Sequence, residues 1–209
     1  GVARLNWSRL YTGSEADFYH ATVMPQDGSL VRARVAPSSY QLYLQRVANP
    51  GPGSDFSQWT AMGSVSAVSG IALASRASSV LLCYVGTDQQ TIYARDSSDS
   101  GATFGDPVAV VTAPAAVGWL AAALNPSGVA ALFYSVGGNV YCVKRSGGTW
   151  GAPAAWSNSA ASISGLACVH QGDWNLAVCG RDASDNRKLW SCVCGDGYSR
   201  DPGVWSALE

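Results

Sequence analysis

The chain has 209 residues, enough for one domain with a sizeable core, and 47% of them are hydrophobic, which excludes a chain that is disordered throughout. Only 13% of the residues are charged, the formal net charge is −1, and no run of like charges occurs, so the composition argues against a nucleic-acid-binding protein and against a polybasic membrane patch. No apolar run reaches the roughly 18 residues of a membrane-spanning helix, since even the stretch 108–124 is interrupted by Thr112, Pro114 and Gly118.

A repeat of 48 to 50 residues organises the chain. An apolar residue followed by an aromatic one recurs at Leu42-Tyr43, Ile92-Tyr93, Val140-Tyr141 and Leu189-Trp190, so that the aromatic residues lie 50, 48 and 49 positions apart. A second aromatic residue follows each pair, at Trp59, Phe104, Trp150 and Trp205. Short strands that recur with a period of about 40–50 residues are typical of the blades of a β-propeller.

The predicted strands fall into four sets of four. The first set is 17–24, 30–35, 41–47 and 58–63, and the second is 70–75, 80–85, 91–96 and 103–111. The third set is 119–124, 129–135, 139–144 and 149–156, and the fourth is 165–170, 175–179, 188–194 and 204–208. Glycine-rich and polar turns separate the strands, as hairpin connections require.

These sets predict an all-β fold, a single domain over residues 1–209 that forms a β-propeller of about four four-stranded antiparallel blades. The blades are expected at 17–63, 70–111, 118–156 and 165–208. The first strand of each set is rich in small residues, which fits the innermost position, where strands converge on the axis. Residues 1–12 are expected to carry a leading strand, because Asn6-Trp7-Ser8 is similar to the later fourth strands. The four blades either close a ring with this extra strand or form part of a larger propeller.

The segment Ser97–Phe104 joins two apolar runs through a turn. Asp99 can accept hydrogen bonds from backbone N–H groups further along, Gly101 can adopt a positive φ, and Thr103-Phe104 is expected to begin the next strand. The pattern Ser-x-Asp-x-Gly-x-Thr-Phe resembles the Asp-box of sialidase-type β-propellers, also called the BNR repeat. The corresponding stretches of the other three units match it poorly.

This resemblance implies a fold and not a catalytic site. In sialidases the Asp-box lies on the outer edge of a blade, so the resemblance gives Ser97, Asp99, Gly101, Thr103 and Phe104 a structural role. Sialidases also need an arginine cluster, a Tyr–Glu nucleophile pair and an acid Asp, and their first arginine comes from a Phe/Tyr-Arg-Ile-Pro segment. That segment is absent from this sequence. We therefore assign no catalytic residue and expect a non-catalytic member of the class or a fragment of one.

Cysteine and histidine give little support for a metal or a cofactor. The six cysteines are expected to be buried thiols, with a Cys168–Cys179 bridge as the alternative. The Cys192/Cys194 pair lacks a second pair at zinc-ligand spacing. The two histidines, His20 and His170, have the same parity in first strands, so they are either ordinary polar residues or a site for an ion. No cofactor is predicted.

Polar residues gather in the turns that leave one face of the propeller. The carboxylates there are best explained as turn caps, with an acid/base pair as the alternative, and they are Glu15, Asp17, Asp88, Asp182 and Asp185. A second group could stack on a sugar ring and hydrogen-bond to its hydroxyls, and we predict it as the binding surface. Its members are Tyr40, Gln89, Gln90, Asn139, Arg181 and Asn186.

We therefore expect a non-enzymatic β-propeller module for binding or adhesion, which recognises a glycan or a protein through its loop face. A surface built mainly from Ser, Gly, Thr, Asn and Gln fits a secreted, cell-surface or phage-tail-like protein, so the expected location is extracellular, at a cell surface or in a virion. Two alternatives stay open, a sialidase-like glycoside hydrolase fragment and a structural subunit of a virion or filament. Assembly into a homo-oligomer or a larger particle is compatible with all three.

Overall fold

The computed structural model describes residues 19–36, 39–67, 69–125, 127–156, 162–171, 175–182, 189–194 and 206–208. For Tyr19, Ser64, Ser164 and every described residue from His170 onward, only the backbone is described. Within these ranges all regular structure is β-strand, and no helix is long and apolar enough to cross a membrane.

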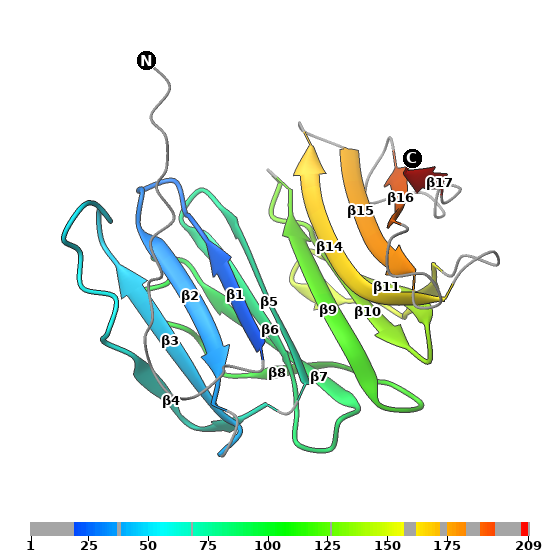
Figure 1. Cartoon of the computed structure of the whole chain (residues 1–209), viewed down its shortest axis with the longest axis horizontal. Coiled ribbons are helices and arrows are strands. Elements are labelled where there is room, and N and C mark those ends of the chain that lie inside the picture. Colours follow the sequence, from blue (N-terminus) through cyan, green and yellow to red (C-terminus); the bar gives the residue numbers. More distant parts are fainter. Residues whose placement is uncertain are drawn as a thin grey trace.

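The strands form four antiparallel sheets, each a meander in chain order (Figure 1). Blade one contains β1 (Tyr19–Val23), β2 (Leu30–Val35), β3 (Gln41–Val47) and β4 (Thr60–Ser66), and blade two contains β5 (Ser69–Arg76), β6 (Ser79–Val85), β7 (Thr91–Ser97) and β8 (Val108–Thr112). Blade three contains β9 (Val117–Leu124), β10 (Ala130–Val136), β11 (Asn139–Ser146), β12 (Thr149–Trp150) and β13 (Ala154–Ala155), with β12 and β13 both paired to β11. Blade four contains β14 (Ile163–Gln171), β15 (Asn175–Asp182), β16 (Leu189–Cys194) and β17 (Ser206–Leu208).

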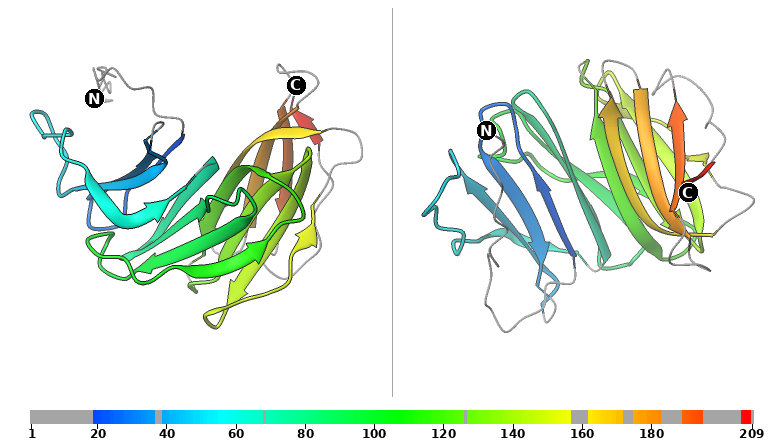
Figure 2. Two further views of the ribbon diagram at one scale, coloured as in Figure 1. Left: turned by 90° about the horizontal axis from the view of Figure 1, so that it is seen from below. Right: turned by 45° about the horizontal axis from the view of Figure 1, so that its top comes forward.

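The first strand of each blade is the innermost one, as predicted. Strand β5 contacts β1 on one side and β9 on the other, and β9 in turn contacts β14. Small side chains such as Ala72, Ala74 and Ala122 allow these strands to approach one another, and all three are buried. Viewed from below (Figure 2, left), the blades follow an arc with blade one and blade four at its two ends. The fold is thus a β-propeller in which the sheets are arranged radially.

The hydrophobic core lies between consecutive blades, because successive residues of a strand point to opposite faces of its sheet. Leu82 packs toward blade one, whereas its neighbour Leu81 packs toward blade three. Between blades three and four, Phe133 meets Trp156 edge to face, with ring centroids 4.8 Å apart. Each fully buried Leu or Phe stabilises the fold by about 1.5–3 kcal/mol. Blades two and three therefore bury both faces, which explains the nearly continuous burial along β6 and β10.

The fourth strand of blade one is shifted, at 60–66 and not 58–63, and the fourth strands of blades two and three differ more from the prediction. The fourth strand of blade two begins at Val108 and not at Thr103, because the turn extends until Gly105 N donates to Asp96 O at 2.8 Å. The fourth strand of blade three is divided into β12 and β13, and Pro153, which has no N–H to donate, lies in the interruption. Residues 1–12, the predicted leading strand, lie outside the described residues, and so does Trp205.

The cysteines whose side chains are described match the main prediction. Cys83 and Cys142 are buried thiols, and Cys168 is a half-buried thiol. In the backbone register Cys168 pairs with Val178 and Cys179 pairs with Ala167, so Cys168 and Cys179 are not cross-strand partners. The alternative of a Cys168–Cys179 bridge is therefore wrong. The side chains of Cys179, Cys192 and Cys194 lie outside the described residues.

Candidate functional site

The connections between second and third strands and those between consecutive blades emerge at the same end of the sheets, which we call the loop face. Backbone hydrogen bonds join the two kinds of connection in each of the first three blades. Ala67 N donates to Tyr40 O at 2.8 Å, Ala113 N donates to Gln90 O at 3.0 Å, and Ile163 N donates to Gly138 O at 2.9 Å. The loop face therefore has a regular framework that fixes the backbone of the predicted binding residues.

Three residues of the predicted set, Gln89, Gln90 and Asn139, lie on the loop face and are all exposed. Val117 N donates to Gln89 O at 2.8 Å, and Val117 pairs with Val136, which pairs with Asn139. Tyr40 is exposed on the same face but belongs to blade one, where its backbone N–H donates to Ala36 O and its carbonyl accepts from Ala67 N. For Arg181, in β15, only the backbone is described, and Asn186 lies outside the described residues.

Trp119 joins this group, although sequence analysis gave it no role beyond the start of a strand. It lies two residues after Val117 and is 42% exposed. Its backbone N–H donates to Ser135 Oγ at 3.1 Å, which fixes the start of β9 against β10. The available signal was a single large aromatic residue in a strand whose other members are Ala, Leu, Val and Gly. Its exposure could not be foreseen from residue type, because Trp156, which lies in the connection from blade three to blade four, is buried.

Two loop-face residues adopt a backbone conformation that L-residues rarely take. Tyr40 has φ 55° and Gln89 has φ 63°. A non-glycine residue in this left-handed region costs about 1–2 kcal/mol. Such strained residues cluster at functional sites. The strain at Tyr40 is the more informative, because its ring is 46% exposed and contributes little to the core.

Asp88 is a turn cap, one of the two explanations considered for it. Its carboxylate accepts hydrogen bonds from the backbone N–H groups of Gln90 and Thr91, at 3.0 and 2.9 Å, and from the Thr91 hydroxyl. The hydrogen bonds from Thr91 contribute most to holding the pKa of Asp88 below its ordinary value. Glu15, Asp17 and Asp185 lie outside the described residues, as does the side chain of Asp182.

The turn of residues 97–104, which we name the Asp-box turn for its resemblance to that motif, lies at the opposite end of the sheets from the loop face. Asp99 Oδ1 accepts from Thr103 N at 2.9 Å and from Ser97 Oγ at 2.7 Å, and Asp99 Oδ2 accepts from Thr103 Oγ1 at 2.6 Å. Gly101 N donates to Ser97 Oγ at 2.9 Å, and Gly101 has φ 79°. Phe104 packs against the core between blades one and two. These contacts organise the turn and the blade junction.

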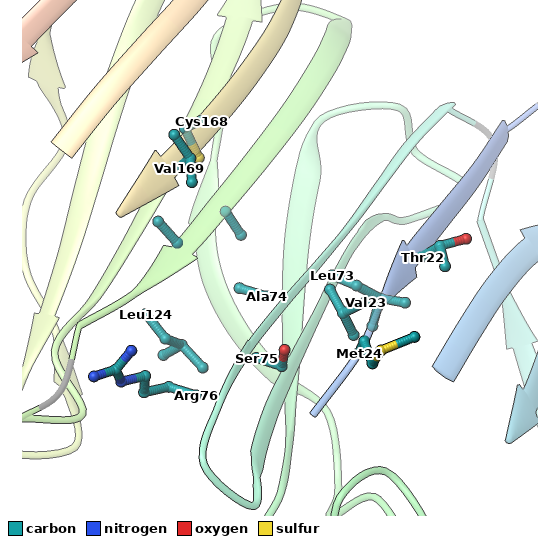
Figure 3. A pocket seen from close by; sticks show the side chains of 12 residues that line it. Thr22, Val23, Met24, Leu73, Ala74, Ser75, Arg76, Leu124, Cys168 and Val169 are labelled. Carbon is teal, nitrogen blue, oxygen red and sulfur yellow. The ribbon is translucent and has the colours of Figure 1, made fainter. Parts of the chain in front are cut away.

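A cavity of about 330 Å³ lies between the inner strands β1, β5, β9 and β14 (Figure 3). Figure 3 shows Thr22, Val23 and Met24 on one side of it and Cys168 and Val169 on the other. Its lining is mainly apolar, with Thr22, Ser75 and Arg76 as polar members. His20 is exposed on β1, the side chain of His170 is outside the described residues, and the side chains that are described include no group of three His, Cys, Asp or Glu able to hold a metal ion.

Blade one has a further cluster, of arginine and aromatic side chains, on the sheet face turned away from blade two. The Arg34 guanidinium lies 5.2 Å from the Tyr43 ring and 4.6 Å from the Trp59 ring, and the Arg32 guanidinium lies 4.7 Å from Trp59. Blades two and three carry tyrosine pairs at the position of Arg34 and Tyr43, Tyr84–Tyr93 at 5.6 Å and Tyr134–Tyr141 at 5.3 Å. The three pairs thus occupy equivalent positions in their blades, but blade one has an arginine where blades two and three have a tyrosine.

No family model matches the chain, and no curated protein sequence matches it either. Solved structures do. The Aleuria aurantia lectin N224Q mutant in complex with α-methyl-L-fucoside has a TM-score of 0.62 and 16% identity, over 91% of this chain and 59% of the lectin. The Penicillium chrysogenum α-L-arabinanase complexed with arabinobiose has a TM-score of 0.65 and 12% identity, over 92% of this chain and 66% of the arabinanase. The Hadza microbial sialidase Hz136 has a TM-score of 0.57 and 14% identity, over 90% of this chain and 45% of the sialidase.

These neighbours establish the fold, because lectin, arabinanase and sialidase propellers all share it with this chain. The identities are too low to transfer an activity. The chain also spans less than two thirds of the length of each of the three structures.

Proposed function

We propose that this chain is a non-enzymatic binding module that holds a saccharide on its loop face, at the group formed by Gln89, Gln90, Trp119 and Asn139. The observation that carries the proposal is the exposure of Trp119 and of three amide residues on loop-face segments that are joined through Val117 and Val136. The apolar face of a pyranose packs on an aromatic ring, and amides both donate to and accept from sugar hydroxyls. Sites of this kind combine an apolar platform with a few polar groups that fix orientation.

Tyr40 supports the same proposal from blade one. Tyr40 has a strained backbone, and its ring is half exposed and adds little to the core. This combination favours a binding role for the ring over a structural one. Because Tyr40 lies on the same face, its ring offers a second platform to a saccharide longer than one residue.

The structural neighbours support a carbohydrate ligand at the level of the fold. One of them is a lectin bound to a fucoside, and another is an arabinanase bound to arabinobiose. The arabinanase and the sialidase keep the second function, a glycoside hydrolase fragment, worth testing. We also propose an extracellular, cell-surface or virion location, which the low content of charged residues supports.

The test is a glycan array probed with the wild-type chain and with Trp119→Ala. Loss of one stacking platform should weaken binding about tenfold, which corresponds to about 1.4 kcal/mol. Val108→Ala is the matched control, because Val108 is 54% exposed on the outer strand β8, away from the loop face. Both variants should keep the wild-type melting temperature.

Four outcomes separate the candidate functions. Weaker binding in Trp119→Ala with unchanged binding in Val108→Ala supports the proposal. Equal binding by both variants contradicts the loop-face site. Turnover of fluorogenic glycosides by the wild-type chain favours the hydrolase, whereas neither binding nor turnover favours a structural subunit.

A further inference from the structure

The Asp-box turn packs into the junction between blades one and two. Ser100 O accepts a hydrogen bond from Arg46 Nε at 3.0 Å and another, longer one from Ser29 Oγ at 3.5 Å. Arg46 is itself held by Asp27, with Nη2 and Oδ2 2.8 Å apart. Ser100 is buried as a result. Blade one thus offers a hydroxyl and a guanidinium, and the turn of blade two supplies the oxygen that accepts from both.

The next junction lacks such a turn. Blade three joins β11 to β12 through the two residues Gly147 and Gly148, because Ser146 already pairs with Thr149. The strand pair Val80 and Ser97 of blade two is equivalent to the pair Leu30 and Val47 of blade one. The residues just before them are therefore equivalent too, so Ser79 takes the position of Ser29 and Asp96 takes that of Arg46. The corresponding place between blades two and three is therefore left as a cleft.

This cleft has a volume of about 330 Å³, and its lining combines the polar side chains of Arg76, Asp96 and Arg145 with a larger share of apolar surface. Arg145, from blade three, reaches across it, and its Nη1 donates to Asp96 Oδ2 of blade two at 2.6 Å. The Arg145 guanidinium also lies 5.2 Å from the ring of Trp150, its cross-strand neighbour. Only 13% of the Arg145 side chain is exposed, whereas 56% of the Asp96 side chain is exposed. The arginine is thus fixed by two partners while the carboxylate still faces solvent.

We infer that this cleft is a second binding site, which takes one saccharide residue through neighbouring hydroxyl groups. Asp96 accepts from one hydroxyl, Arg145 donates to the next, and Arg76 and Ser98 line the same cleft and add a further donor and a hydroxyl. Because the acceptor Asp96 stands where blade one has the donor Arg46, a ligand here must donate to the carboxylate as well as accept from the guanidinium. The inference shares its ligand class with the proposed function but concerns the opposite end of the sheets.

A saccharide fits this lining better than a simple anion does. The Asp96 carboxylate would repel an anion placed beside Arg145, whereas a pair of hydroxyls can donate to the carboxylate and accept from the guanidinium. A volume of about 330 Å³ is near the lower limit of ligand pockets, so the site suits one sugar ring and not an extended chain.

The experiment compares the same glycan array across the wild-type chain, Asp96→Asn, Ser79→Trp and Trp119→Ala. Asp96→Asn removes the charged acceptor, and Ser79→Trp fills the cleft from an exposed position while leaving both charges in place. We expect one set of glycans to lose at least tenfold in affinity in both variants and to be retained by Trp119→Ala. Asp106→Asn, an exposed carboxylate in the segment after the Asp-box turn, is the control and should bind as wild type does. Melting temperatures of all variants establish that they are folded.

The two proposals fail in different ways. If every glycan bound by the wild-type chain is retained by Asp96→Asn and Ser79→Trp, the cleft is not a binding site, whatever Trp119→Ala does. If signals are lost only in the two cleft variants, the cleft binds and the loop face does not. If the wild-type chain binds no glycan, both proposals are overturned.

Discussion

Gly101 of the Asp-box turn lies directly against Val31 of blade one. A Cβ on Gly101 would lie 2.7 Å from Val31 Cγ2, and Gly101 has φ +79°. Gly101→Ala therefore combines a steric clash with a strained backbone, and we expect a loss of stability of about 1–3 kcal/mol, or a fall in Tm of about 2–10 °C. Urea unfolding followed by circular dichroism measures it.

Gly53→Ala is the matched control for this prediction. Gly53 has φ +86°, so an alanine there carries the same backbone strain, but nothing lies within 4 Å of an added Cβ. The difference between the two variants isolates the contact with Val31. Equal losses in both would mean that the turn is not seated against blade one.

Asp99 makes the stability of the chain depend on acid pH. Hydrogen bonds from Thr103, and then from Ser97, hold the pKa of Asp99 well below its ordinary value of 3.8. A carboxylate with a lowered folded-state pKa stabilises the fold fully above its unfolded pKa, and that contribution is lost as pH falls through the folded pKa. We expect the Tm of the wild-type chain to fall progressively as pH is lowered below about 3.8.

Asp99→Asn tests the origin of this dependence. The amide cannot titrate, so the variant should melt lower than wild type at pH 6 and lose less Tm between pH 6 and pH 3. Asp27, whose pKa is lowered to about 2 by its hydrogen bonds with Ser29, should keep part of the acid sensitivity in the variant. An unchanged pH profile would show that the Asp99 carboxylate has no part in acid unfolding.

The fold could be predicted because its signals are local and recur. The second and third strands of blade one were predicted with the bounds that the structure has, 30–35 and 41–47, because alternating apolar residues and the turn residues around them define both ends. The start of β8 could not be predicted in this way. Phe104 is aromatic and follows a threonine, as strand residues often do, but its ring is used to pack the turn against blade one.

The candidate sites depend on tertiary contacts that the sequence pattern does not contain. Gln89 and Asn139 were predicted on one face, and the structure links their turns through Val117, which donates to Gln89 O and pairs with Val136. The cleft between blades two and three was not foreseen. It lies where blade three has only a two-residue turn between β11 and β12. In the sequence Asp96 and Arg145 are ordinary charged residues, and only the packing of the two blades brings them together.

Tyr40→Gly should separate binding from stability. The backbone hydrogen bond from residue 40 N–H to Ala36 O is kept, and glycine adopts φ 55° without the strain that tyrosine bears. This relief offsets the greater freedom of glycine in the unfolded chain, so we expect the Tm to stay within about 3 °C of wild type. Binding of an oligosaccharide should weaken about tenfold if the ring is a second platform. A large loss of Tm would instead place the Tyr40 ring in the fold.

Cys83 should be unreactive in the folded chain. Its side chain is completely buried in the core between blades two and three, and burial raises the pKa of the thiol to about 12. The thiolate is the reactive form, so both its low population at pH 8 and the lack of access protect it. Iodoacetamide labelling followed by peptide mass spectrometry should leave Cys83 unmodified in buffer and modify it in 6 M guanidinium chloride. Rapid labelling of Cys83 in buffer, with the Tm unchanged, would contradict this prediction. It would mean that blades two and three separate readily in solution, so that the core formed by Leu81, Ile92 and Leu132 is not maintained.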